Sequence, residues 1–198
     1  MDDTTLKLRM VERLSEVDRE AWDAVANPPG RTFDPFLSWD FLEAMESSHA
    51  AIPETGWTPA HLLVEGVDKT LRAAMPLYAK THSQGEFVFD HNWADAYYRS
   101  GGQYYPKLLS AVPFTPVSGR RLLSAPGADE VHLQRALLAG AVQLAERNEF
   151  SSLHVNFLQP DTAEALKQDG MMIRTDQQFH WQNDGYESFD DFLAALSS

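Results

Sequence analysis

The sequence of 198 residues contains no cysteine. Disulfide bonds, thiolate zinc sites and a cysteine nucleophile are therefore excluded within it. Basic residues are also scarce, because 16 Lys and Arg stand against 29 Asp and Glu, a formal net charge of −13. A chain this acidic is not expected to bind nucleic acid through bulk charge. Its chemistry must rely on carboxylates, histidines, hydroxyls and backbone amides.

Long hydrophobic runs are absent as well. A membrane-spanning helix needs about 20 mostly apolar residues, and the sequence holds no such run. The first five residues, Met1 to Thr5, are acidic and polar, whereas a secretory signal begins basic and continues into an apolar stretch. We therefore predict a cytoplasmic protein without a membrane span, although a peripheral membrane contact would leave no such trace.

Several short motifs with known chemistry are missing too. There is no Gly-x-Ser-x-Gly nucleophile elbow, and Ser100-Gly101-Gly102 fits neither the dinucleotide-binding nor the Walker pattern. Four side chains of metal-binding type, His82, Glu86, Asp90 and His91, have a spacing that matches no compact metal motif. We therefore expect no metal site.

The patterns that are present are those of a folded α/β domain. The apolar fraction of 43% is near the usual range of roughly 45–50%, and the length fits one domain or one lobe of a larger protein. Apolar periodicity predicts helices over 16–25 (after Ser15), after Ser38, and over 129–148, 161–168 and 189–196 (after Ser188). It predicts strands over 6–11, 61–65, 71–78, 86–90 and 153–157, and one within 171–181. The strands at 61–65, 71–78 and 86–90 are close enough to form an antiparallel meander.

The last predicted helix carries an apolar face, Phe189, Phe192, Leu193 and Leu196, that is still running when the sequence stops. Neither a glycine nor a basic last turn marks its end. We therefore expect residues 1–187 to form an N-terminal lobe and residues 188–198 to begin a helix that leads to a second lobe absent from this chain.

Residues 80–121 concentrate polar and aromatic side chains, including two histidines, three carboxylates, four tyrosines and a tryptophan. Such clusters on loops beside a sheet are typical of binding sites. On a strand over 86–90, Glu86 and Asp90 share one face about 13 Å apart at ~3.3 Å per residue. They would then be too far apart to act as a coupled pair, but they can line one groove. His91, at the end of that strand, is a candidate base.

Glu86, Asp90 and His91 are therefore the predicted acid–base groups. Lys107 and Arg121 are local cations in an acidic chain, suited to a phosphate or a carboxylate. The predicted substrate-binding residues are His82, Trp93, Asp95, Tyr104, Tyr105, Lys107 and Arg121. An ordinary solvated edge with loop hydrogen bonds and surface ion pairs is the alternative for all of these residues.

Five segments of the sequence resemble one bacterial family. They are Gly56 to Leu62, His82 to Asp90, Trp93 to Tyr97, Tyr104 to Leu108, and Val112 to Val117. The sequence resembles the FemAB-like family of predicted N-acyltransferases, which is associated with peptidoglycan biosynthesis and lies in the GNAT superfamily. The resemblance covers nearly the whole chain.

The resemblance implies a GNAT-like lobe with a mostly antiparallel mixed sheet flanked by helices. It implies transfer of an acyl or aminoacyl group to an amine on a small-molecule or peptide acceptor such as a cell-wall precursor. The acceptor amine must be deprotonated, a step suited to a carboxylate or a histidine. The implied donor is an acyl-CoA or an aminoacyl-tRNA.

One departure from the superfamily concerns the donor. The usual pyrophosphate-binding loop for acetyl-CoA is absent after Asp90. A tRNA donor, in turn, would require a basic continuation of this acidic chain. A non-catalytic substrate-binding lobe, or a structural lobe of a two-lobe protein, is the alternative to an enzyme. The oligomeric state is left open.

Overall fold

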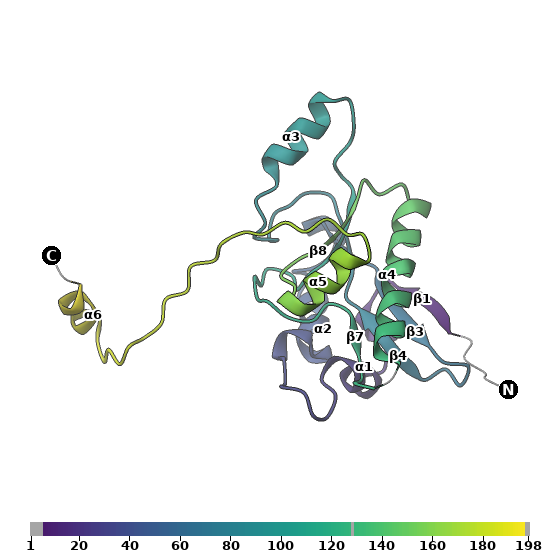
Figure 1. The fold of residues 1–198 in the computed structure, drawn as a ribbon, viewed down its shortest axis with the longest axis horizontal. Helices are drawn as coiled ribbons and strands as arrows, with labels where there is room; N and C mark the ends of the chain where they lie inside the picture. The colour runs from purple at the N-terminus through teal and green to yellow at the C-terminus, as the bar shows by residue number, and fades with distance from the viewer. Residues whose placement is uncertain (1–5, 128, 197–198) are drawn as a thin grey trace. The chain divides into compact units, whose positions relative to one another are not determined.

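The computed structural model of the chain describes residues 6–127 and 129–196. The chain divides into two units, Met1–Ala163 and Glu164–Ser198, and the boundary falls inside helix α5 (Pro160–Gln168). All the strands lie in the first unit, where they form two four-stranded sheets (Figure 1). Short 3-10 helices span Leu14–Glu16, Pro35–Leu37 and Pro53–Thr55. No helix among the described residues is long and apolar enough to cross a membrane.

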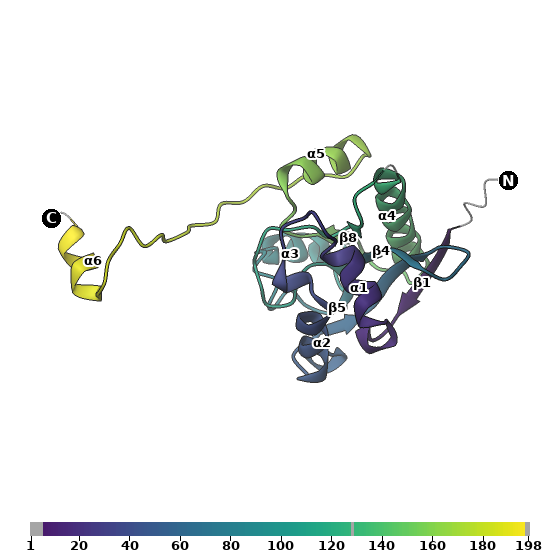
Figure 2. The ribbon, with the colours of Figure 1, turned by 90° about the horizontal axis from the view of Figure 1, so that it is seen from below.

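The first sheet is fully antiparallel. Its order is β1 (Lys7–Val11), β3 (His61–Glu65), β4 (Leu71–Met75) and β7 (Leu123–Ser124). Helices α1 (Arg19–Ala26) and α4 (Glu130–Arg147) both contact it, and Figures 1 and 2 show its strands beside these two helices.

Both faces of this sheet are covered, as two neighbouring residues of β3 show. Consecutive strand residues point to opposite faces, yet Leu62 and Leu63 are both buried. Leu63 belongs to a cluster with Trp22 of α1. Leu62 faces Gly140 of α4, where a Cβ would stand 2.9 Å from its Cδ2. Gly140 therefore lets α4 approach the sheet closely.

The second sheet has the order β2 (Trp57–Pro59), β5 (Tyr78–Lys80), β6 (Lys107–Ser110) and β8 (Leu153–Val155). Its pairs are antiparallel except β6 with β8, which is parallel. The predicted single strand over 71–78 is thus two strands in different sheets. Pro76 interrupts it, since proline has no N–H for the ladder, and the chain changes sheet there.

Local caps explain where several helices begin. Ser38 caps α2 (Trp39–Ser47) as predicted, its Oγ accepting from Phe41 N–H at 3.3 Å. The helix predicted after Ser15 instead starts after Asp18, whose carboxylate accepts from Ala21 N–H at 2.9 Å. A carboxylate at the N-cap also interacts favourably with the helix dipole, so Asp18 sets the start of α1.

Two predicted strands are wrong. Residues 86–90 are irregular and lead into helix α3 (His91–Arg99), which the sequence pattern did not predict. Phe87 has φ +55°, a left-handed conformation that interrupts an extended strand. Phe87 and Phe89 are 52% and 72% exposed, whereas Glu86 and Asp90 are buried. The alternation of polar and apolar side chains is therefore present without a strand, and Glu86 and Asp90 are the buried side chains. Residues 171–181 are extended but pair with no strand among the described residues.

The second unit contains the predicted last helix, α6 (Phe189–Ala195). Its predicted cap is confirmed as a capping box, in which Asp191 N–H donates to Ser188 Oγ at 3.2 Å and Ser188 N–H to Asp191 Oδ2 at 3.0 Å. The prediction that residues 188–198 lead to a further lobe stays a prediction, and residues 197–198 lie outside the described residues.

Substituting Gly56 tests a close approach beside β2. Gly56 has φ +74°, and a Cβ there would stand 2.3 Å from His82 Nε2. Gly30 has φ +85° but open space around it. We expect Gly30→Ala to lower the free energy of unfolding by about 1 kcal/mol through left-handed strain alone, and Gly56→Ala to lower it further because the imidazole must move. Urea unfolding of both variants measures this, and equal losses would contradict the predicted contact.

Candidate functional site

The ammonium group of Lys107 is the centre of a buried polar cluster. Lys107 opens β6 and is 1% exposed. Its Nζ donates to Ser83 Oγ at 2.9 Å, to Glu86 Oε2 at 2.9 Å and to Asp90 Oδ2 at 2.6 Å. An ammonium has three N–H donors, so these three acceptors use all of them. Lys107 is thereby fixed in position.

Glu86 and Asp90 meet at this one nitrogen, although they come from an irregular loop. The sequence-based expectation of about 13 Å between them assumed an extended strand and is wrong. The turn at Phe87 and the start of α3 at Asp90 fold the loop back, and each carboxylate has an oxygen within 3 Å of Lys107 Nζ. Both residues are 2% exposed.

Two of the predicted substrate-binding residues, Tyr104 and Tyr105, extend the cluster. Tyr104 O–H donates to Asp90 Oδ2 at 2.9 Å, and Tyr105 Oη lies 2.6 Å from Ser83 Oγ. The two rings meet edge to face with centroids 5.0 Å apart. Their centroids lie 5.4 and 5.6 Å from Lys107 Nζ, within reach of a cation–π attraction. The cluster is therefore both hydrogen-bonded and aromatic.

Sequence reasoning missed a second buried lysine. Lys80 of β5 pairs directly with Lys107 across the sheet and is 0% exposed. Its Nζ lies 3.6 Å from the centroid of the Trp57 ring and donates to the Gln84 carbonyl at 3.3 Å. Ser83 was missed as well. A signal for Lys80 existed, because it follows two apolar residues on a strand, where a buried lysine stands out.

Burial and charge set the protonation of the two carboxylates in opposite directions. Burial raises the pKa of Glu86 despite the nearby Lys107 ammonium. Burial also acts to raise the pKa of Asp90, but hydrogen bonds from Lys107, Ser83 and Tyr104 outweigh it and leave that pKa below its ordinary value. Divergent pKa values in neighbouring carboxylates are a mark of acid–base sites.

Burial likewise perturbs the lysine and the tyrosines. It lowers the pKa of Lys80 to about 7, an effect that Glu86 opposes and Lys107 strengthens. Burial and the hydrogen bond to Asp90 raise the pKa of Tyr104. Burial raises the pKa of Tyr105 as well. Both phenols are therefore protonated at neutral pH.

Two oxygens of the cluster lack a donor. Glu86 Oε1 and Asp90 Oδ1 are buried and have no hydrogen-bond partner among the described residues. Leaving a buried charged acceptor unsatisfied costs more than the roughly 1–3 kcal/mol of a neutral group, so such groups in a folded protein call for a functional explanation. They are suited to accept hydrogen bonds from an amine or a hydroxyl of a bound molecule.

The other predicted residues lie outside this cluster. His82 sits at its margin beside Gly56, and burial and the Lys80 ammonium lower its pKa. His91, Trp93 and Asp95 are exposed on α3. Arg121 is fully buried, and its guanidinium donates to the Arg120 and Val117 carbonyls at 2.8 and 2.7 Å. No group of three or more His, Asp or Glu side chains among the described residues is placed to hold a metal ion.

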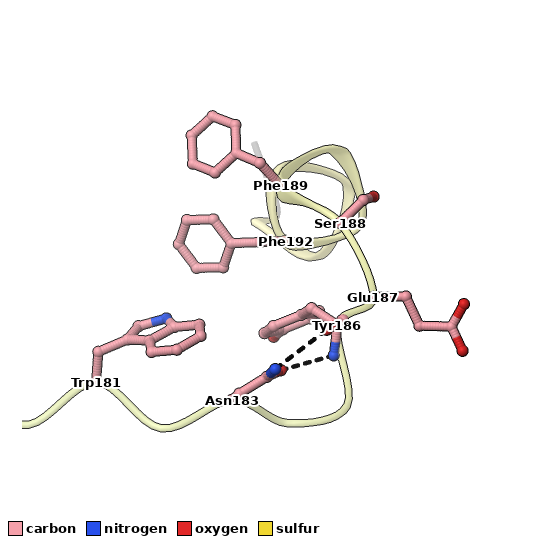
Figure 3. A pocket seen from close by; sticks show the side chains of 7 residues that line it. All are labelled: Trp181, Asn183, Tyr186, Glu187, Ser188, Phe189 and Phe192. Carbon is pink, nitrogen blue, oxygen red and sulfur yellow. Dashed lines mark hydrogen bonds between the residues drawn. The ribbon is translucent and has the colours of Figure 1, made fainter.

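A separate hollow of about 450 Å³ lies within the second unit, lined chiefly by Trp181, Tyr186, Phe189 and Phe192 (Figure 3). The ring of Phe192 packs on the other three at centroid distances of 5.6 to 6.1 Å. Since the rings contact one another, this hollow is the margin of a small aromatic cluster that steadies α6. The Glu187 carboxylate points away from the hollow (Figure 3).

Comparisons with known proteins identify first the fold and then the family. Glucosamine-6-phosphate N-acetyltransferase from Arabidopsis thaliana aligns with a TM-score of 0.50 and 9% identity, covering 90% of this chain and 99% of that chain. An aminoglycoside 6'-N-acetyltransferase from Acinetobacter baumannii aligns with a TM-score of 0.49 and 12% identity, covering 91% of this chain and 99% of that one. The first of these alignments, at a TM-score of 0.50, shows that the chain has the mixed α/β fold of GNAT acetyltransferases.

The chain belongs to the FemAB-like family, described as peptidoglycan biosynthesis/recognition, whose model matches residues 13–198. This confirms both the family resemblance and the fold class predicted from the sequence. A search among curated proteins found no match.

Removing the central ammonium tests how strongly the cluster depends on it. We expect Lys107→Met to lower the free energy of unfolding by about 3–5 kcal/mol, because two buried carboxylates lose their cation. Lys7→Met, an exposed lysine that also opens a strand, is the control and should change stability by less than about 0.5 kcal/mol.

Adding Glu86→Gln and Asp90→Asn to Lys107→Met should recover much of the loss, because no buried carboxylate is then left without its cation. In the single variant the folded-state pKa values of both carboxylates rise above their unfolded values. Stability is then retained below those unfolded values and lost as the pH rises through the folded ones. Urea unfolding at pH 5 and pH 8 should show the larger deficit at pH 8, and an equal deficit at both would refute the assignment.

Proposed function

We propose that this chain is an N-acyltransferase in which Glu86 and Asp90 bind and deprotonate the acceptor amine. The observation that carries the proposal is a pair of buried oxygens, Glu86 Oε1 and Asp90 Oδ1, that have no donor in the part of the chain that the structure describes. They lie beside an ammonium that already neutralises one charge. An amine nitrogen with two N–H groups satisfies two such acceptors. Family membership and the acetyltransferase fold support the same reaction class.

The two carboxylates divide the acid–base work. Glu86, whose pKa is raised by burial, is the better general base near neutral pH. Asp90, whose pKa is lowered, stays ionised and orients the amine. The amine nitrogen then attacks the acyl carbon of the donor, the N–C bond forms, and the C–S or C–O bond to the leaving group breaks. The proton taken from nitrogen finally passes to that leaving group.

Access to the cluster requires movement of the segment that covers it. Helix α3 has one buried residue, Ala94, and Figure 1 shows it standing out from the strands on two loops. An element with so little buried apolar surface opens at low free-energy cost. Displacing α3 moves Asp90, its N-cap, and uncovers Glu86. In this arrangement the exposed His91, Trp93 and Asp95, together with His82, meet the acceptor.

The substrates follow from the site and the family. The acceptor is an amine on a small molecule or peptide, and the family description points to cell-wall precursors. The proposed donor is an acyl-CoA, and an aminoacyl-tRNA is the second donor to be tested. The cytoplasm holds both donors and is the proposed location.

A non-catalytic lobe that recognises a cell-wall precursor is the second candidate. The observation that favours it is the burial of both carboxylates, which are 2% exposed. Isothermal titration with a muropeptide, in the absence of any donor, measures recognition by itself. Binding without transfer from either donor would favour this second candidate over the first.

Conservative substitutions test the enzymatic proposal. With acetyl-CoA or an aminoacyl-tRNA as donor and a muropeptide carrying a free amine as acceptor, mass spectrometry follows the acylated product. We expect Glu86→Gln to lower the turnover rate by about 10²–10⁴-fold, the usual contribution of a general base, and Asp90→Asn to lower it as well. Glu12→Gln is the control, because it replaces an exposed carboxylate directly after β1. If Glu86→Gln, Asp90→Asn and His91→Ala each leave acyl transfer unchanged, the proposal is wrong.

A further inference from the structure

A serine and a histidine beside β6 are hydrogen-bonded to each other. Ser152 stands directly before β8, and its Oγ lies 2.8 Å from Nε2 of His154 within that strand. Alternate residues of a strand point to the same face, so this spacing places both side chains on one side of the sheet. Both residues are half-buried. A molecule in solution therefore reaches them more readily than it reaches His61, which is fully buried.

The second sheet holds this pair in place. Leu108 N–H of β6 donates to the Ser152 carbonyl at 2.9 Å, and β6 pairs with β8 in parallel. The His154 ring packs edge to face on the Tyr104 ring at a centroid distance of 6.1 Å. Sites built on strands keep their geometry better than sites on loops, so the sheet fixes the contact between Ser152 and His154.

A count of protons shows where the Ser152 hydroxyl is directed. A serine hydroxyl has one proton to donate, and Ser151 uses its proton on the Tyr104 carbonyl. Ser152 Oγ has two acceptors within reach, Ser151 Oγ at 3.3 Å and His154 Nε2 at 2.8 Å. The imidazole nitrogen is both closer and more basic. It accepts the hydrogen bond when the ring carries its own proton on Nδ1.

This is the arrangement of an activated nucleophile. A serine hydroxyl is a weak nucleophile by itself, and an adjacent base that removes its proton makes it reactive. Such a pair needs a heavy-atom distance of about 2.6–3.2 Å, which the contact between Ser152 and His154 satisfies. The pair also shares a neighbour with the acid–base cluster, because Tyr104 contacts the His154 ring and donates to Asp90.

We infer that Ser152 is a nucleophile with His154 as its general base, and that Ser152 accepts an acyl group from an activated ester or thioester. His154 Nε2 takes the hydroxyl proton and the Oγ–C bond forms. The C–O or C–S bond to the leaving group then breaks, and His154 passes the proton to that group. Water next attacks the acyl carbon and gives one proton to His154. The Oγ–C bond breaks, and Ser152 Oγ regains the proton.

The products are a carboxylic acid and an alcohol or a thiol. This hydrolytic activity uses neither Glu86 nor Asp90, and it needs no amine. It therefore goes beyond the proposed function and does not rest on it.

Acylation of the whole chain without any amine acceptor tests the inference. The probes are p-nitrophenyl acetate, an activated ester, and acetyl-CoA, a thioester. We expect a burst of about one p-nitrophenolate per chain, the kinetic sign of an acyl-enzyme, and an acetyl group that peptide mass spectrometry places on Ser152. The probe that acetylates Ser152 shows whether the site takes esters, thioesters or both. If neither probe acetylates Ser152, the inference is overturned.

Variants then assign the roles of the two residues. Ser152→Ala should abolish the burst, and His154→Gln should slow it by about 10²–10⁴-fold, the usual contribution of a general base. Ser100→Ala is the matched control and should leave the burst unchanged, because it removes an exposed serine whose Oγ donates to the Tyr97 carbonyl at 2.7 Å. A burst that persists in Ser152→Ala would overturn the inference. The label is mapped in the wild type, so a variant that fails to fold does not hide the result.

Addition of a muropeptide amine separates this inference from the proposed function. Acetylated Ser152 without any transfer to the amine would support the inference and contradict the proposed function. Transfer to the amine by a chain whose Ser152 is never acetylated would support the proposed function and overturn the inference.

Discussion

The site depends on the hydrogen bonds and ion pairs that the buried ammonium of Lys107 makes. It brings together the carboxylates of Glu86 and Asp90 from an irregular loop, and one oxygen of each lies within 3 Å of Lys107 Nζ. Charges are expensive to bury, and a buried pair repays that cost only with good geometry and further hydrogen bonds. Here Ser83 and the phenol of Tyr104 supply those hydrogen bonds. The arrangement is nevertheless incomplete, since Glu86 Oε1 and Asp90 Oδ1 have no donor within residues 6–127 and 129–196, and a stable core alone does not require such groups.

The fold explains why this ammonium can be held so rigidly. Lys107 begins β6, a central strand of the second sheet with β5 on one side and β8 on the other. The chain leaves that sheet after Pro59, where β2 gives way to β3, and returns to it after Pro76, where β4 gives way to β5. The first sheet, covered by α1 and α4, contributes Val11, Leu63, Ala74 and Leu123 to an apolar core cluster. The second sheet carries the buried lysines, and the loop between β5 and α3 brings Glu86 and Asp90 to Lys107.

Much of the fold follows from local sequence. The long apolar periodicity of α4, the serine caps of α2 and α6, and the strands at β1 and β3 were predictable because each rests on side chains near one another in the chain. The strand predicted over 86–90 failed for a specific reason. Its period-two pattern is real, but the polar residues face inward to Lys107, which lies 17 residues or more away in sequence. Pattern alone cannot show which face of a segment is buried.

The sequence by itself determined the family, the α/β class, and the segment in which polar and aromatic side chains are concentrated, with Glu86, Asp90, Tyr104, Tyr105 and Lys107 among them. Only the tertiary structure decided how these side chains act together. It placed both carboxylates on one ammonium, put Lys80 opposite Lys107 across β5 and β6, and gave Arg121 an environment of backbone carbonyls. The physical reason is that burial and proximity, which set the protonation of these groups, are properties of strand pairing and chain reversal. The order of residues in the sequence does not contain them.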